Sequence, residues 1–102
     1  MTVPNAVRGE VALVLGDETL CLRPGFAALV AAEAELGPLF ALVERAAAGG
    51  LMLSEMTALF WHCLAPPEAL DRAHLGDRLV SAGLANVTPA LRAMLAQILA
   101  GR

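Results

Sequence analysis

The first regular pattern along the chain lies near its N-terminus. Large apolar side chains recur at every second position between residues 8 and 15, and again between residues 19 and 23. The pair Gly16-Asp17, which is typical of a tight turn, separates the two stretches. This alternation predicts a β-hairpin over about residues 8–23. Because two strands alone are only marginally stable in water, the hairpin must pack against helices.

From residue 25 onward the apolar residues follow the period of amphipathic helices. Gly37 is expected to end the first helix, Ser54 to cap the N-terminus of the third, and Thr88-Pro89 to begin the last. The segment between residues 67 and 82 is less regular and is divided by Gly76. The predicted helices span about residues 25–36, 38–48, 54–65, 67–73, 75–82 and 89–100.

Four of these helices carry an apolar stripe that is expected to face a core. One hairpin followed by four to six short helices predicts a mostly helical α+β fold. With 102 residues and no repeat or linker, a single domain over residues 1–102 is expected. The stripes are Phe26, Leu29, Val30 and Leu36; Leu39, Leu42, Val43 and Ala46; Met56, Leu59, Phe60 and Cys63; and Leu91, Met94, Leu95, Ile98 and Leu99.

The composition contains more apolar surface than one small core can bury. Hydrophobic residues make up 58% of the chain, whereas globular domains usually contain about 45–50%. A domain of this size buries only about two-thirds of the surface that its unfolded chain exposes. The surplus therefore indicates oligomerisation or an apolar partner. The alternative is a well-packed monomer with an alanine-rich surface.

The charge pattern excludes several classes of function. The net charge is −3, and all seven basic residues are arginines, so the positive surplus needed to grip nucleic-acid phosphates is missing. No uncharged stretch reaches the roughly 20 residues that cross a bilayer. The first ten residues lack the apolar segment of a secretory signal. We therefore expect no nucleic-acid or membrane partner and no secretory signal.

Candidate chemistry is sparse. Cys21 and Cys63 are the only cysteines, and no disulfide between them is expected. Cys63 falls on the apolar stripe of the third helix, where a thiol acts as a small buried hydrophobe. His62, Cys63 and His74 offer too few ligands at no recognised zinc spacing. A nucleophilic pair of Cys63 with a histidine is the enzyme alternative, but no orienting third group or oxyanion hole is recognisable. We expect no catalytic, cofactor or metal site.

Two residues stand out as candidate partner-binding residues. Glu33 falls inside the apolar stripe of the first helix, whereas Glu35 faces the opposite side. A carboxylate on that face should pair with an arginine such as Arg23 or Arg45, extend to the edge of the stripe, or be held at an interface as a specificity charge.

Trp61 projects away from the apolar stripe of the third helix. Either that helix is buried on two sides, or Trp61 anchors a contact with a partner. The second alternative predicts that Trp61→Ala weakens binding and leaves the fold intact. Glu68 and Arg72, four residues apart, are expected to form a solvated ion pair on the predicted helix over 67–73.

Several short stretches, read in order, resemble a known family. They are Gly9-Glu10-Val11-Ala12-Leu13, Leu22-Arg23-Pro24, Phe26-Ala27-Ala28-Leu29, Glu33, Leu36-Gly37, Leu42, Ala82-Gly83-Leu84 and Pro89-Ala90-Leu91. Together they resemble the gene transfer agent family of phage-derived proteins, called tail tube or tail assembly chaperone proteins. The likeness is strongest over residues 9–42. The chain departs from the pattern at Gly16-Asp17, where Asp-Gly is usual, and at Gly25, where a helix-capping residue is usual.

The resemblance implies a small cytoplasmic, non-enzymatic protein made during assembly of a phage-like particle. Tail assembly chaperones of this type coat the tape measure protein and deliver it for polymerisation of the tail tube. The implied partners are therefore the tape measure protein and the tail tube protein, together with self-association. The alternative is a structural tail tube subunit. Such subunits depend on large β-sheets that close into rings, whereas only one hairpin is predicted in this chain.

Overall fold

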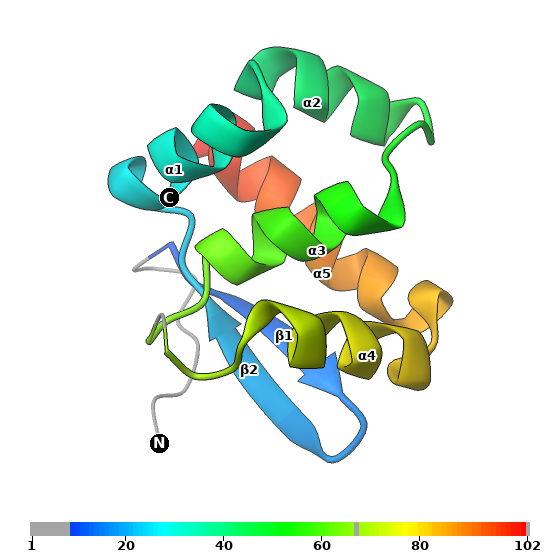
Figure 1. Cartoon of the computed structure of the whole chain (residues 1–102). Helices are drawn as coiled ribbons and strands as arrows, with labels where there is room; N and C mark the ends of the chain where they lie inside the picture. The colour runs from blue at the N-terminus through cyan, green and yellow to red at the C-terminus, as the bar shows by residue number, and fades with distance from the viewer. Residues whose placement is uncertain (1–8, 67, 102) are drawn as a thin grey trace.

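The computed structural model describes residues 9–66 and 68–101. It contains a two-stranded sheet followed by five helices (Figure 1). This arrangement confirms the predicted mostly helical α+β fold. The elements are β1 (Val11–Leu15), β2 (Glu18–Leu22), α1 (Phe26–Leu36), α2 (Leu39–Ala47), α3 (Leu53–His62), α4 (Arg72–Ala82) and α5 (Leu84–Ala100).

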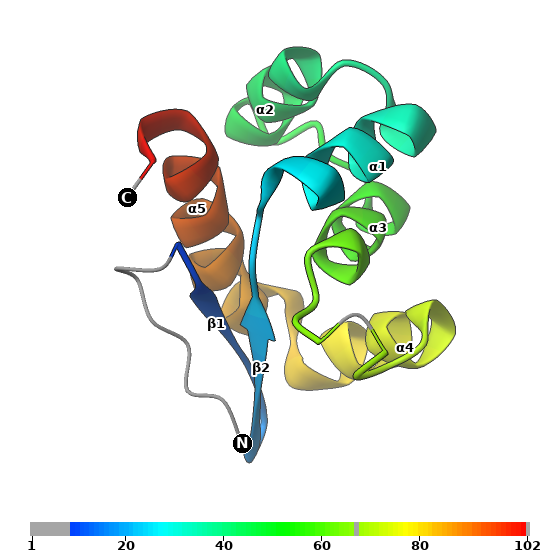
Figure 2. The ribbon, with the colours of Figure 1, turned by 90° about the vertical axis from the view of Figure 1, so that its left-hand side faces the viewer.

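The hairpin forms with the predicted turn. β1 and β2 are antiparallel, with Val11 opposite Leu22 and Leu15 opposite Glu18. Gly16 has a positive φ of 66°, which a glycine adopts without strain in a two-residue turn. Along β1 buried and exposed residues alternate, so one face of the sheet points into the core. In Figure 2 the hairpin lies between α5 on one side and α3 and α4 on the other.

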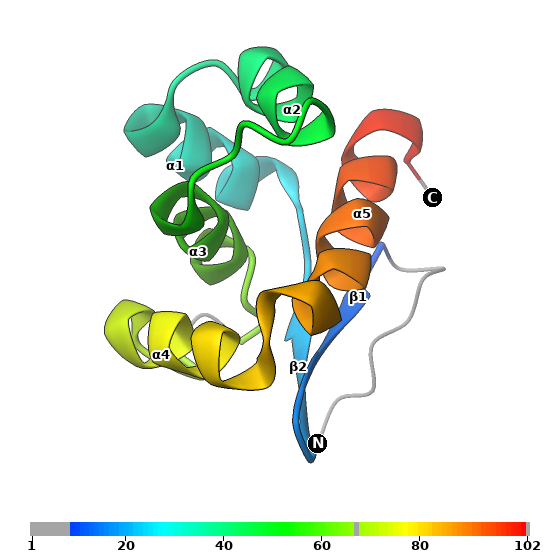
Figure 3. The ribbon, with the colours of Figure 1, turned by 90° about the vertical axis from the view of Figure 1, so that its right-hand side faces the viewer.

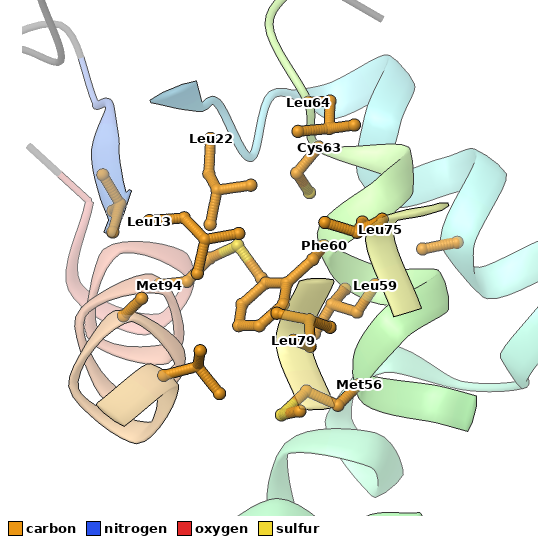
Figure 4. Close-up of a cluster of buried hydrophobic side chains, with 14 of the residues drawn as sticks. Leu13, Leu22, Met56, Leu59, Phe60, Cys63, Leu64, Leu75, Leu79 and Met94 are labelled. Atoms are coloured by element: carbon orange, nitrogen blue, oxygen red, sulfur yellow. The ribbon is translucent and has the colours of Figure 1, made fainter. Parts of the chain in front are cut away.

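The core forms where the hairpin, α3, α4 and α5 meet. The predicted stripe of α3 is confirmed, because all four of its members are buried. Phe60 is fully buried, and Figure 4 shows its ring among Leu13 of β1, Leu79 of α4 and Met94 of α5. Side chains from three other elements therefore surround this aromatic ring of α3. α2 lies at the edge of this core and buries Leu42 and Val43, as its pattern predicts.

α1 begins and ends close to the predicted positions but buries a different face. Its buried residue is Ala32, and Ala28, Leu29 and Leu36 are packed partly against the core. Phe26, which we predicted to face the core, is 86% exposed, and Val30 is 45% exposed. The physical reason is that α1 is apolar on nearly all sides, so its sequence does not define one core face. Packing against α3 selects the side of Leu29, Ala32 and Leu36 and leaves the side of Phe26 and Val30 exposed.

The segment before α4 is not helical, so the predicted helix over 67–73 is wrong for residues 68–71; residue 67 lies outside the described residues. α4 begins at Arg72 because Asp71 caps it: the Asp71 carboxylate accepts a hydrogen bond of 2.8 Å from the backbone N–H of His74. Gly76 lies inside this helix and does not divide it. The single helix ends before Gly83, as predicted.

α5 begins five residues earlier than predicted, at Leu84, and includes Pro89 in its second turn. Proline there removes one backbone donor, while the hydroxyl of Thr88 donates a 2.8 Å hydrogen bond to the carbonyl of Leu84. The buried face contains Val87, Ala90 and Met94, with Leu91 and Ile98 packed beside it. Leu99, which we predicted to face the core, is 61% exposed. α3 likewise begins at Leu53, one residue before its predicted cap at Ser54.

Sharp bends separate successive helices. α1 and α2 meet at 79°, and α4 and α5 meet at 117° at Gly83, where φ is 92°. Among residues 9–66 and 68–101, no single helix is long and apolar enough to cross a membrane; each of these two bent pairs reaches that length and composition only in combination. Figure 3 shows the result of the second bend, with α5 turned away from α4 to lie along β1.

Candidate partner-binding surface

Glu33 is exposed and caps the next helix. Its Oε2 accepts a hydrogen bond of 2.9 Å from the backbone N–H of Leu39, the first residue of α2. The predicted pairing with Arg23 or Arg45 is wrong, because Arg23 lies 3.9 Å from Glu10 and Arg45 lies 2.7 Å from Glu55. A carboxylate at a helix N-terminus compensates unpaired backbone donors and the positive end of the helix dipole. A partner-binding role for Glu33 stays a prediction.

Trp61 lies near the C-terminal end of α3, and its half-buried side chain packs against the segment that precedes α4. Its indole Nε1–H donates a 3.2 Å hydrogen bond to the carbonyl of Leu70. The guanidinium of Arg72 lies 4.6 Å from the ring centroid, a cation–π contact. α3 is therefore covered on two sides, which was one of the two alternatives. Because these contacts are within the chain, Trp61→Ala is now expected to destabilise the fold, contrary to our prediction of an intact fold.

An ionic cluster that we did not predict joins α1, α3 and α4. The Arg72 guanidinium donates two hydrogen bonds to the Glu35 carboxylate, at 2.5 and 2.8 Å. His62 Nε2 lies 2.9 Å from the same carboxylate. Arg72 thus pairs with Glu35. Our prediction of an ion pair between Glu68 and Arg72 is wrong. Its guanidinium binds Glu35 in bidentate fashion while stacking on Trp61, so it links three helices at one end of the molecule.

The cluster predicts an acid-dependent stability. The hydrogen bonds from Arg72 and His62 lower the pKa of Glu35 from 4.5 to about 2. A carboxyl whose pKa is depressed in the folded state contributes stability that is present above pH 4.5 and is lost as the pH falls toward 2. We expect Glu35→Gln to remove this contribution, so its melting temperature will decline less steeply than that of the wild type between pH 4.5 and 2. Thermal melts followed by circular dichroism measure both slopes.

The matched control for this experiment is Glu68→Gln, which changes an exposed glutamate outside the cluster. It should follow the wild-type decline. Glu55 and Asp71 also have lowered pKa values, caused first by the backbone N–H groups of Met52 and His74. These two carboxyls preserve part of the acid sensitivity in every variant. Equal slopes for Glu35→Gln and the wild type would contradict a stabilising role of the cluster.

A groove runs between α3 and α4, next to this cluster. Figure 1 shows the two helices side by side. The groove has a volume of about 670 Å³, and its walls are mainly apolar. Leu53 and Val80 line it while remaining 42% and 57% exposed. The lining residues are Glu35, Leu53, Ser54, Thr57, Arg72, Ala73, Gly76, Asp77 and Val80. Such a groove can receive the apolar face of an amphipathic helix.

Gly76 of α4 lies in the wall of this groove. A methyl group added at Gly76 would lie 3.6 Å from Thr57 Cγ2, an ordinary contact distance. A side chain no larger than this methyl would therefore already touch Thr57, so α3 and α4 lie close together at Gly76. Five of the nine lining residues carry polar side chains, namely Glu35, Ser54, Thr57, Arg72 and Asp77, and Glu35 and Arg72 are paired with each other. This arrangement offers apolar contact area with a small number of orienting charges.

The cysteines lie in the interior. Cys63 is 1% exposed and Cys21 is also buried, and the two do not form a disulfide. Burial raises the pKa of Cys63 to about 12, so the thiol stays protonated at neutral pH and is a poor nucleophile. The prediction of a small buried hydrophobe at Cys63 is confirmed. Its neighbour His62 contacts Glu35, and among residues 9–66 and 68–101 no three His, Cys, Asp or Glu side chains gather in a metal-binding cluster.

The family model described as "Phage tail tube protein, GTA-gp10" matches residues 8–101. The chain belongs to this family. No curated protein and no solved structure matches it. Membership in the GTA-gp10 family confirms the resemblance to gene transfer agent proteins and supports a role in a phage-type tail. It does not decide between a chaperone and a tube subunit.

For this GTA-gp10 family member, sequence reasoning missed the groove and the residues that line it. Leu53 and Val80 fall outside every predicted apolar stripe, and that was the available signal: large apolar residues with no assigned core face. Trp61 and Glu33 were singled out correctly as unusual, but their surroundings were not predicted. Trp61 stacks on Arg72 next to the groove, whereas Glu33 lies at the junction of α1 and α2.

Proposed function

We propose that this member of the GTA-gp10 family is a cytoplasmic tail assembly chaperone that binds an amphipathic helix of the tape measure protein in the α3–α4 groove. The observation that supports this most directly is the exposed apolar surface of Leu53 and Val80 along an open groove. Large apolar side chains at a concave surface are typical of a site for another polypeptide. The tail tube protein would then displace the chaperone as the tube polymerises.

The chemistry of the groove defines the expected client segment. A helix placed between α3 and α4 would present apolar residues at positions i, i+3 or i+4, and i+7. The Asp77 carboxylate on the groove wall and the net charge of −3 favour basic residues beside that apolar stripe. A client contact of this size buries little surface, so each chaperone would bind weakly. When many chaperones each bind a long client weakly, the tail tube protein can displace them one at a time.

The small sheet also favours the chaperone over a tube subunit. The sheet has two strands, and part of the outer edge of β2 is already paired within the chain. The backbone N–H of Arg23 donates to Cys63 at 2.6 Å, and that of Ala65 donates to Cys21 at 3.0 Å. A ring built by extending sheets from subunit to subunit needs unpaired strand edges. β2 offers such an edge over only part of its length.

A structural tail tube subunit is the second candidate, and the family description favours it. Electron microscopy of the purified protein separates the two candidates. Regular tubes or rings would support the tube subunit and contradict the chaperone. Dispersed particles that bind tape measure segments would support the chaperone.

The test of client binding uses peptides that tile the tape measure protein of the same phage-type tail. Trp61 is the only tryptophan and stacks on Arg72 of the groove wall, so its fluorescence should report binding. We expect Val80→Asp to weaken binding of the best peptide at least about tenfold. The substitution would place a charge where the bound peptide covers an apolar side chain.

The matched control is Leu99→Asp, which changes another exposed large hydrophobic residue, 61% exposed, on α5. It lies outside the groove and should bind like the wild type. Two results would overturn the proposal: no tape measure peptide binds the wild type, or Val80→Asp and Leu99→Asp bind equally well.

A further inference from the structure

α1 is apolar around almost its whole circumference. One side packs on the core, as described above. The opposite side consists of five exposed apolar residues that share an arc of about 140° at 100° per residue. We call this arc the outer face of α1; it contains Phe26, Ala27, Val30, Ala31 and Ala34. A helix that is apolar on all sides is typical of a helix buried on all sides, and α1 of this chain has one side uncovered.

The two charges of α1 lie at the margins of this outer face and are engaged within the chain. Glu33 accepts a hydrogen bond from the backbone of Leu39. Glu35 accepts hydrogen bonds from Arg72. Both carboxylates are therefore held away from the middle of the face, which carries no charge. If another apolar surface covered this face, both carboxylates would keep their hydrogen-bond partners.

We propose that the outer face of α1 binds the same face of a second copy of this chain, with the two helices antiparallel. Charge complementarity supports both the occupant and its direction. Glu33 and Glu35 lie in the C-terminal half of α1; Arg72 neutralises Glu35, so the exposed carboxylate of Glu33 gives this end its acidic charge. Arg23 lies just before the N-terminus of α1, 3.9 Å from the buried Glu10, and its side chain is 57% exposed. That N-terminus has no acidic residue in its first turn and no side-chain cap.

Antiparallel pairing places the basic end of each helix beside the acidic end of the other, at both ends of a twofold contact. Parallel pairing would place four glutamates at one end. The small side chains of Ala27, Ala31 and Ala34 permit a short distance between the helix axes, because that distance is set by the side chains at the contact. Phe26 and Val30, exposed by 86% and 45%, are then covered.

The size of the contact sets its strength. A helix of 11 residues is about 16 Å long, so the face is smaller than the roughly 800 Å² per partner of a standard stable interface. The dimer is therefore weak and depends on concentration. Apart from Glu35, its residues are not those of the α3–α4 groove, and the inference stands whether or not the groove binds the tape measure protein.

Sedimentation velocity over a wide range of concentrations tests the dimer. We expect the wild type to associate reversibly and Ala31→Glu to weaken association at least about tenfold, because the carboxylate would be desolvated within the contact. The matched control, Ala93→Glu, changes an exposed alanine of α5 and should associate like the wild type. A wild type that stays monomeric, or equal association of the two variants, would overturn the proposal.

Disulfide cross-linking tests the direction. Residues 27 and 34 are seven positions apart, about 10.5 Å along the helix axis, and a disulfide requires Cα atoms within about 7 Å. In an antiparallel pair, Ala27→Cys and Ala34→Cys should cross-link when mixed and not when oxidised separately. Cross-linking of each variant with itself would contradict the antiparallel arrangement. The unsubstituted chain is the control, since Cys21 and Cys63 are buried.

Discussion

Replacing Phe60 with alanine is expected to lower the free energy of unfolding by about 3–5 kcal/mol. The side chain is fully buried, and residues from the hairpin, α4 and α5 surround its ring (Figure 4). Alanine would lose the transfer free energy of the aromatic ring and leave a cavity that four elements cannot easily close. Since small domains are stable by only about 5–15 kcal/mol, the variant would lose a large part of its stability. Urea unfolding followed by circular dichroism measures the difference.

The chain provides a control with the same chemical change. Phe40 on α2 is 77% exposed, so Phe40→Ala removes an identical side chain without opening a cavity. Its effect on the free energy of unfolding should stay within about 0.5 kcal/mol. Similar losses for the two variants would contradict the placement of Phe60 at the centre of the core.

The elements that the sequence predicted well are those with strong local signals. The hairpin follows from alternation on both sides of Gly16-Asp17, and the pairing of Leu15 with Glu18 is what a two-residue turn requires. The stripe of α3 was correct because Met56, Leu59, Phe60 and Cys63 share one side of the helix and all four are buried. In both cases short-range pattern and long-range packing agree.

α1 and α5 show where local pattern is insufficient. α1 is apolar all round, so its sequence contains no unique core face. The choice between the side of Leu29 and Ala32 and the side of Phe26 depends on packing against α3, which is a property of the assembled fold. In α5, Pro89 suggested a helix start. Burial of Val87 against the core outweighs the hydrogen bond that Pro89 cannot make.

The candidate site was the least predictable part. Glu35 and Arg72 are 37 residues apart, and no spacing rule connects such distant positions. Glu68, four residues before Arg72, offered a local partner, but the chain there is not helical and the pairing rule does not apply. Trp61 was recognisable as a residue outside its stripe. Its hydrogen bond to Leu70 depends on the path of a segment whose helical assignment was wrong.

Replacing Trp61 with alanine is expected to lower the free energy of unfolding by about 2–3 kcal/mol, less than for Phe60 because Trp61 is only half-buried. The variant loses apolar packing, the hydrogen bond to the Leu70 carbonyl and the surface on which Arg72 stacks. Arg72 would then retain Glu35 as its partner and lose its second contact. Urea unfolding gives the size of the loss.

A conservative variant separates these contributions. Trp61→Phe preserves an aromatic ring for Arg72 and most of the apolar packing but removes the indole donor to Leu70. It should cost about 1 kcal/mol, the usual net value of one hydrogen bond. A larger loss for alanine than for phenylalanine identifies Trp61 as the residue that holds the segment before α4 against α3. If Trp61→Ala leaves the free energy of unfolding unchanged and still abolishes self-association, Trp61 is a partner-contact residue. That result would contradict the packing of its side chain against Leu70.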